Sequence, residues 1–175
     1  MSDRDELLQL IKDLAVVHGR VVLSSGREAD WYIDLRRITL HRQAAPLVGR
    51  VMLDTCSGWT FDAAGGLTLG ADPVATAMLH ASGGAIDAFV VRKEGKAHGL
   101  QRRIEGPDVA GRAVVAVEDT STTGSSVLTA VDALREAGAS VAGVAVIVDR
   151  GARPAVEEAG LEYRAAYSLD ELGLG

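Results

Sequence analysis

Three stretches of the sequence are apolar almost without interruption, and they constrain the fold more than any other feature. They cover residues 86–91, 113–118 and 141–148. A strand with one face in water alternates apolar and polar side chains, whereas a strand of a parallel sheet covered by helices on both faces is apolar throughout. The pattern therefore predicts an α/β fold with a central, mostly parallel sheet flanked by helices.

The remaining segments have the spacing of helices or the composition of turns. Apolar residues recur at helical spacing over residues 7–17, which predicts an N-terminal helix with Ser2 and Asp5 as its capping box and Gly19 as its end. Further strands are predicted at residues 20–24, 31–35 and 61–64, and further helices from about residue 43, from Asp72 as N-cap before Pro73, and over 125–137. The first two strands would form a small β element beside the main sheet.

Length, charge and cysteine content exclude several classes of protein. The 175 residues suit one domain, and a net charge of −6 argues against the broad basic face that nucleic acid requires. Cys56 is the only cysteine, so neither an intrachain disulfide nor a thiolate metal cluster can form. The N-terminus is charged, and no apolar run reaches membrane-spanning length. We expect a cytoplasmic protein without nucleic-acid or membrane partners.

The apolar stretch at 113–118 ends in two carboxylates and continues into a turn rich in hydroxyl groups. Glu118 and Asp119 are acceptors suited to a vicinal diol such as that of ribose. The turn consists of Thr120, Ser121, Thr122, Thr123, Gly124, Ser125 and Ser126. Hydroxyl groups and free N–H groups at the start of a helix bind phosphate. The alternative is an ordinary strand-to-helix turn whose Ser and Thr residues only cap the helix.

Residues 92–107 form a polar stretch that is too long for a simple connection. Its first eight residues contain Arg92, Lys93, Lys96 and His98 in an otherwise acidic chain. Flexible lysines and planar arginines are suited to a pyrophosphate whose charge grows as it leaves a sugar. A solvated charged loop is the alternative, although the segment directly follows a predicted buried strand.

These two motifs together resemble those of type I phosphoribosyltransferases, which use phosphoribosyl pyrophosphate (PRPP). The Arg-Lys-Glu-x-Lys-x-His pattern is similar to the mobile catalytic loop of the orotate phosphoribosyltransferases, which crosses a dimer interface. The resemblance implies that Lys96, Arg92 and Asp119 act in catalysis. It also implies that PRPP is bound by Arg92, Lys93, Lys96, His98, Glu118, Asp119 and the residues from Thr120 to Ser126.

Further segments resemble the orotate-binding parts of the same family. Ser25-Gly26-Arg27 and the following aromatic segment are similar to a hood over the base, formed here by about residues 1–40 against a core of about 43–170 in a single domain. By this match Tyr32, Ile33, Thr122 and Arg150 contact orotate. Residues 65–70 look like the pyrophosphate loop of the family, with a flexible turn as the alternative. Many relatives have lysine where this chain has Ser24 and Gly70, and Glu118 replaces the usual first aspartate.

The resemblance implies the transfer of phosphoribose from PRPP to N1 of orotate, which gives orotidine 5′-phosphate and pyrophosphate in pyrimidine biosynthesis. Mg²⁺ is the implied cofactor, held mainly through PRPP rather than by direct protein ligands, and a homodimer with shared sites is the implied assembly. The alternatives are a purine or uracil phosphoribosyltransferase and a PRPP-sensing protein without catalysis.

Overall fold

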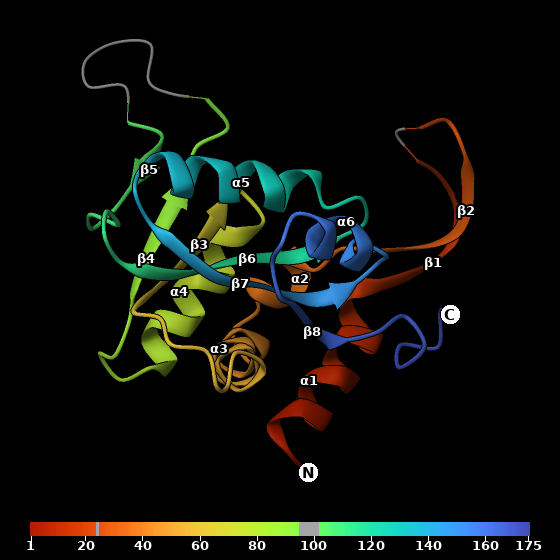
Figure 1. Ribbon diagram of the computed structural model, residues 1–175. Coiled ribbons are helices and arrows are strands. Elements are labelled where there is room, and N and C mark those ends of the chain that lie inside the picture. Colours follow the sequence, from red (N-terminus) through yellow and green to blue (C-terminus); the bar gives the residue numbers. More distant parts are fainter. Residues whose placement is uncertain (24, 95–101) are drawn as a thin grey trace.

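A six-stranded sheet forms the centre of the molecule, in the order β5-β4-β3-β6-β7-β8 (Figure 1). The computed structural model describes residues 1–23, 25–94 and 102–175. Its strands are β3 (Ala63–Leu67), β4 (Asp87–Val91), β5 (Ile104–Glu105), β6 (Ala113–Ser121), β7 (Ser140–Asp149) and β8 (Tyr163–Tyr167). All neighbouring strands are parallel except β4 and β5. The predicted α/β architecture with a mostly parallel sheet is confirmed.

Helices cover both faces of the sheet (Figure 1). One face packs against α1 (Asp3–Leu10), α3 (Ala44–Thr55) and α4 (Ala71–Ala81), and the other against α5 (Ser125–Glu136) and α6 (Arg153–Glu158). Successive residues of β6 alternate between the two cores, with Val115 and Val117 on the first and Val114 and Ala116 on the second. All four are fully buried, which explains why this strand is apolar throughout.

The N-terminal region differs from the prediction. The capping box of Ser2 and Asp5 is present, but α1 ends at Leu10 and continues as a short π-helical segment, η1 (Ile11–Ala15). The chain then forms an antiparallel hairpin of β1 (Val16–Val22) and β2 (Glu28–Ile33), which projects beside the sheet (Figure 1). The helix predicted to reach residue 17 was too long, because β-branched valines at its end favour strand pairing.

The turns around the sheet also differ from the prediction in their bounds. The strand predicted at 61–64 instead begins at Ala63 and runs through Gly65 and Gly66, where a Cβ atom would overlap the carbonyl oxygens of the adjacent strands. The N-cap of α4 is Gly70 and not Asp72, as had been predicted. The Asp72 carboxylate instead accepts a hydrogen bond of 2.6 Å from the Thr68 hydroxyl. A short helix, α2 (Arg36–Thr39), follows the hairpin and was not predicted.

No helix within the described residues combines the length and the apolar character needed to cross a bilayer.

Candidate active site

A cavity of about 460 Å³ lies where β2, β3, β4 and β6 end. It is lined by Ile33, Asp34, Leu35, Arg36, Leu67, Thr68, Leu69, Gly70, Lys93, Glu118, Asp119, Thr120 and Ser126. The carboxyl ends of parallel strands are the usual place for a ligand in such sheets. The cavity brings together six of the residues predicted from the sequence, although they come from segments far apart along the chain: Ile33, Lys93, Glu118, Asp119, Thr120 and Ser126.

Glu118 is a carboxyl group held inside the protein at the wall of this cavity. Only 7% of the residue is exposed, and its Oε1 accepts the N–H of Asp119 at 3.1 Å. Burial, followed by the side-chain hydrogen bond and the charge of Asp119, raises the pKa of Glu118, while the bond from the Asp119 N–H opposes this shift. The raised pKa favours the protonated form of Glu118, which can donate a hydrogen bond to a sugar hydroxyl as well as accept one.

Gly70 leaves the space that the Glu118 side chain occupies. A Cβ atom at position 70 would overlap Glu118 Oε1 and lie 3.0 Å from Asp119 Oδ1. Any side chain at position 70 must therefore displace the buried carboxyl group. This packing gives a physical reason for glycine at position 70.

The hydroxyl-rich segment is part strand and part turn. Thr120 and Ser121 belong to β6, and the Thr120 hydroxyl donates to the carbonyl of Val148 at 3.0 Å. Gly124 then adopts φ +83° and is the N-cap of α5. The Thr123 hydroxyl accepts the N–H of Ser125 at 3.3 Å, which orders the turn in front of the helix.

The exposed residues of this turn are Thr122, Thr123, Ser125 and Ser126. Their hydroxyl groups stand at the N-terminus of a twelve-residue helix. The helix dipole and the free N–H groups of the first turn favour an anion at this position. The turn predicted from the sequence to bind phosphate thus stands at the start of a helix.

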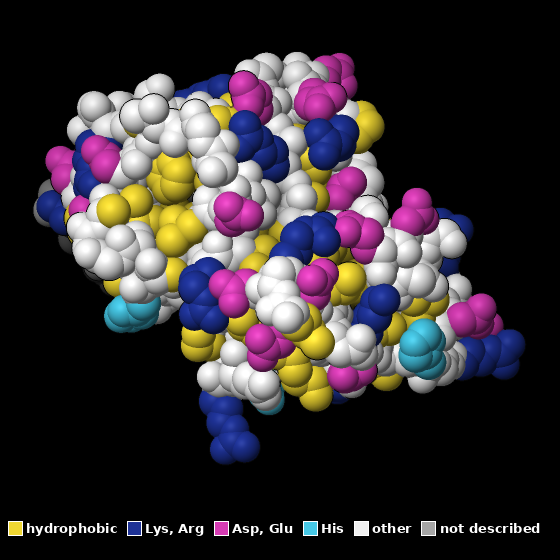
Figure 2. Space-filling model, turned by 90° about the horizontal axis from the view of Figure 1, so that it is seen from below, with side chains coloured by type: hydrophobic (Ala, Val, Ile, Leu, Met, Phe, Trp, Pro, Cys, Tyr) yellow, Lys and Arg dark blue, Asp and Glu magenta, His cyan; other side chains and the backbone are white. Residues whose placement is uncertain are grey.

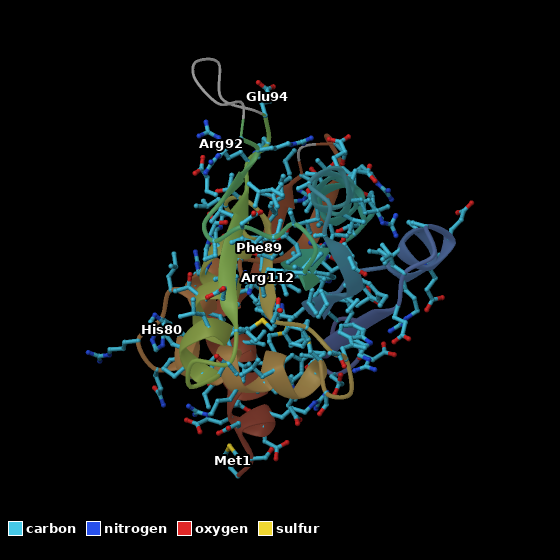
Figure 3. The ribbon with its side chains drawn as sticks, turned by 60° about the vertical axis from the view of Figure 1, so that its left-hand side comes forward. Met1, His80, Phe89, Arg92, Glu94 and Arg112 are labelled. Carbon is cyan, nitrogen blue, oxygen red and sulfur yellow. The ribbon has the colours of Figure 1, made fainter. Side chains whose placement is uncertain are left out.

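Arg92 and Lys93 follow β4 directly at the end of the molecule opposite Met1, and Figure 3 shows Arg92 and Glu94 there. The Arg92 N–H donates to the carbonyl of Arg103 at 2.7 Å, and its guanidinium lies 3.6 Å from Glu105. The Arg103 guanidinium in turn donates to the carbonyl oxygens of Arg92 and Lys93 at 3.1 and 3.0 Å. These bonds tie together the two ends of the cationic segment. Lys96 and His98 lie outside the described residues, as does Ser24.

The residues predicted to contact orotate do not all line the cavity. Ile33 lines the cavity, whereas Tyr32, Thr122 and Arg150 are not among its lining residues. Thr122 and Arg150 lie on adjacent turns, since a Cβ atom at Gly151 would lie 3.6 Å from the Thr122 carbonyl oxygen. Because side chains alternate along a strand, Tyr32 points to the face of β2 opposite to that of Ile33.

Some lining residues were not predicted from the sequence. Asp34, Leu35 and Arg36 contribute to the cavity, and the Asp34 carboxylate accepts from the Arg36 side chain at 3.2 Å. No local pattern distinguishes these residues from an ordinary strand end. Leu67 to Gly70 do lie in the segment that resembles a pyrophosphate loop, and the Thr68–Leu69 peptide bond is cis.

Comparison with known proteins gives a consistent result over the whole chain. A model of the phosphoribosyl transferase domain matches residues 64–162, more than half of the chain. An orotate phosphoribosyltransferase from Streptomyces avermitilis is 67% identical, with 98% of this chain and 97% of that protein covered.

Solved structures agree with this match. The Mycobacterium tuberculosis orotate phosphoribosyltransferase in complex with Fe(III) dicitrate is 59% identical and superposes with a TM-score of 0.92, covering 99% of this chain and 100% of that one. The M. tuberculosis enzyme in complex with PRPP has a TM-score of 0.88 at 53% identity, with the same coverage. High identity along nearly the full length, on the same fold, shows that this chain belongs to the orotate phosphoribosyltransferases of the phosphoribosyltransferase family.

Proposed function

We propose that this protein transfers the 5-phosphoribosyl group of PRPP to N1 of orotate and releases pyrophosphate. The observation that carries the proposal is a cavity in which the buried Glu118, the half-buried Asp119, a lysine and the start of α5 meet. The chain is also 67% identical to a named orotate phosphoribosyltransferase. The product, orotidine 5′-phosphate, is the precursor expected in pyrimidine biosynthesis.

The sugar phosphate is assigned to the groups at the end of β6. In this proposal Glu118 and Asp119 hold the ribose hydroxyls, while the turn from Thr120 to Ser126 binds the 5′-phosphate at the start of α5. The burial and raised pKa of Glu118 support a contact with a neutral diol, because an ionised carboxylate there would need a cation beside it. Positioning of the reacting atoms is the main contribution of these residues to the rate.

The leaving pyrophosphate is assigned to the cationic segment. Lys96 and Arg92 stabilise its growing charge, and Lys93 and His98 assist. Lys93 supports this assignment because it lines the same cavity as the acidic pair. Fixed cations beside a leaving group lower the barrier because they need no reorganisation when the charge develops.

Mg²⁺ is part of the proposal as a cofactor carried by the substrate. Within the described residues, no group of three or more potential ligands is arranged to hold a metal ion. The Asp119 carboxylate is a ligand of the kind that Mg²⁺ prefers, but one such residue leaves most coordination positions to the substrate. The donor set therefore fits an ion bound mainly by PRPP oxygens, where it would neutralise charge on the leaving group.

A homodimer is proposed on the basis of an apolar groove of about 670 Å³ between α2, α3 and α4. Its walls include Leu40, Pro46, Pro73 and Ala77, and Leu40 is 72% exposed. Figure 2 shows exposed hydrophobic side chains on the face that carries α1, α3 and α4.

A second copy of the chain is the proposed occupant of this groove. Leu69, which is 63% exposed, lines both the groove and the candidate site. A partner seated in the groove would thus lie next to the site, as a catalytic loop shared between subunits requires. Cytoplasmic location also belongs to the proposal, supported by the single, buried Cys56, which suits a reducing compartment.

The proposed function is tested by identifying both products. Purified protein incubated with orotate, PRPP and Mg²⁺ should form orotidine 5′-phosphate and pyrophosphate in equal amounts, measured by anion-exchange chromatography. Pyrophosphate without the nucleotide would show that the protein only hydrolyses PRPP and would contradict the proposal.

A further inference from the structure

The backbone around Arg150 is held firmly, whereas its side chain has a single partner among the residues that the structure describes. The Arg150 N–H donates to the carbonyl of Ser121 at 2.9 Å. The preceding Asp149 accepts the N–H groups of Gly151 and Ala152 at 3.0 and 3.2 Å. Asp149 also accepts the Tyr163 hydroxyl at 2.8 Å, which fixes the turn to β8. These bonds position the Cα atom of Arg150 and leave the direction of its guanidinium to other contacts.

The contact that sets this direction comes from the hairpin. The guanidinium carbon of Arg150 lies 5.2 Å from the centre of the Trp31 ring, a distance typical of a cation–π contact. Among the described residues, Arg150 forms no ion pair. A ring on one face of a guanidinium leaves its edge N–H groups available, and these are the groups that bind a planar carboxylate.

The hairpin presents Trp31 on the side of the site. Residues two apart on a strand share a face, so Trp31 points to the same side of β2 as Ile33, which lines the cavity. One face of a single strand thus contacts both the cavity and Arg150. The neighbouring Tyr32, which the resemblance to the family assigns to orotate, lies on the opposite face.

We propose that Trp31 is a positioning residue for orotate, acting through its ring contact with Arg150. The contact holds the guanidinium so that its N–H edge meets the carboxylate of the base, and it couples the hairpin to the base site. This inference rests on the proposed function and on Arg150 as an orotate ligand. Trp31 itself takes no part in bond making or breaking.

The test compares Michaelis constants for the two substrates in Trp31→Ile, a change that keeps strand propensity but removes the ring. The KM for orotate should rise about five- to twentyfold, as expected for the loss of one cation–π contact, while the KM for PRPP stays within about twofold. Trp31→Tyr should restore most of the orotate affinity and Trp31→Phe somewhat less. An equal rise of both constants would indicate a general disturbance of the site and would overturn the proposal.

A matched control exists within the chain. Arg164 lies 4.2 Å from the ring centre of Trp59, a second contact of the same kind, and Trp59 is absent from the lining of the candidate site. Trp59→Phe should leave the KM for orotate unchanged. If it raises that constant as much as the Trp31 variants do, the effect does not pass through Arg150 and the proposal fails.

A double-mutant cycle with Arg150→Gln, which removes the cation, separates the contact from simple packing. In the Arg150→Gln background, Trp31→Ile should add less than twofold to the KM for orotate. An undiminished effect in that background would overturn the proposal. If circular dichroism shows that Trp31→Ile does not fold, the test rests on the wild type, Trp31→Tyr and Trp31→Phe. The KM for orotate should rise in that order, and equal values in all three proteins would contradict the proposal. A wild-type protein without orotate turnover would instead refute the proposed function.

Discussion

At the residue scale, the site depends on how closely Glu118 is packed. The carboxyl group of Glu118 is buried beside Asp119, and Gly70 provides the space for it. The sequence indicated an acidic pair for a diol, but it could not show that the pKa of one member is raised. Burial and the distance between the two carboxyl groups decide the pKa, and both depend on the folded structure.

The raised pKa of Glu118 predicts a pH dependence of stability. Because the pKa of Glu118 is raised in the folded protein, the carboxyl group keeps its proton at pH values above 4.5, where the unfolded chain has lost it. The Glu118 contribution to the free energy of unfolding is therefore fully present below pH 4.5 and decreases as the pH rises, by at most about 1.4 kcal/mol per pH unit. Glu118→Gln removes this titration. Urea unfolding at pH 5 and pH 8 should show the variant gaining stability relative to wild type at the higher pH. If the variant and the wild type differ in free energy of unfolding by the same amount at pH 5 and pH 8, the raised pKa of Glu118 is contradicted.

The packing of Gly70 predicts a compensating pair of substitutions. Gly70→Ala forces the Glu118 carboxyl group to move, since a Cβ atom would overlap it. We expect the Kd for PRPP to rise about tenfold, a loss typical for a displaced hydrogen-bonding group. Glu118→Asp in the same chain shortens the acid by one methylene and should recover part of the affinity. Calorimetric titration with PRPP measures both, and a neutral effect of Gly70→Ala would show that Glu118 does not contact the ribose.

At the scale of single elements, apolar runs predicted the central strands, but the predicted ends were accurate for only some of them. β4 and β7 lie within one residue of the expected bounds, because strands buried on both faces leave little ambiguity. β6 continues to Ser121 because Thr120 and Ser121 pair with Val148 and Asp149, a long-range contact with no local signal. The N-terminal helix was overestimated for a related reason, since Val16 and Val17 join the hairpin.

The cationic segment after β4 gives a prediction at this scale. Lys96→Ala should lower turnover by about a thousandfold, the effect of removing one preorganised charge, while the melting temperature stays unchanged. The control variant Lys12→Ala removes an exposed lysine from η1, far along the chain from the site, and should keep wild-type turnover. Wild-type activity of Lys96→Ala in a coupled pyrophosphate assay would contradict the catalytic assignment.

At the scale of the whole molecule, the sequence indicated the fold class and the family, whereas the surfaces came only from the structure. Motifs separated by up to about ninety residues converge because parallel strands end at one edge of the sheet. The groove beside α3 and α4 and the contact of Trp31 with Arg150 have no sequence signature. Both arise from side chains of different elements, whose relative placement depends on the complete packing.

The proposed dimer predicts a change of assembly from one surface substitution. Leu40→Asp places a charge in the groove, where the proposed partner would bury it at a cost of several kcal/mol. The variant should be monomeric in sedimentation velocity experiments and retain its secondary structure, because Leu40 is 72% exposed in the single chain. Val22→Asp is the control, since Val22 is 68% exposed on the hairpin. A Leu40→Asp protein that stays dimeric would exclude this face as the interface.

Base specificity tests the central claim most directly. The absorbance of orotate is followed with PRPP and Mg²⁺, beside parallel reactions that contain hypoxanthine, adenine or uracil. We predict that the orotate signal falls only when PRPP and Mg²⁺ are both present, with the other bases turned over at least about a thousandfold more slowly, because Arg150 would lack its carboxylate partner. Turnover of another base in place of orotate, or binding of PRPP without turnover of any base, would contradict the account.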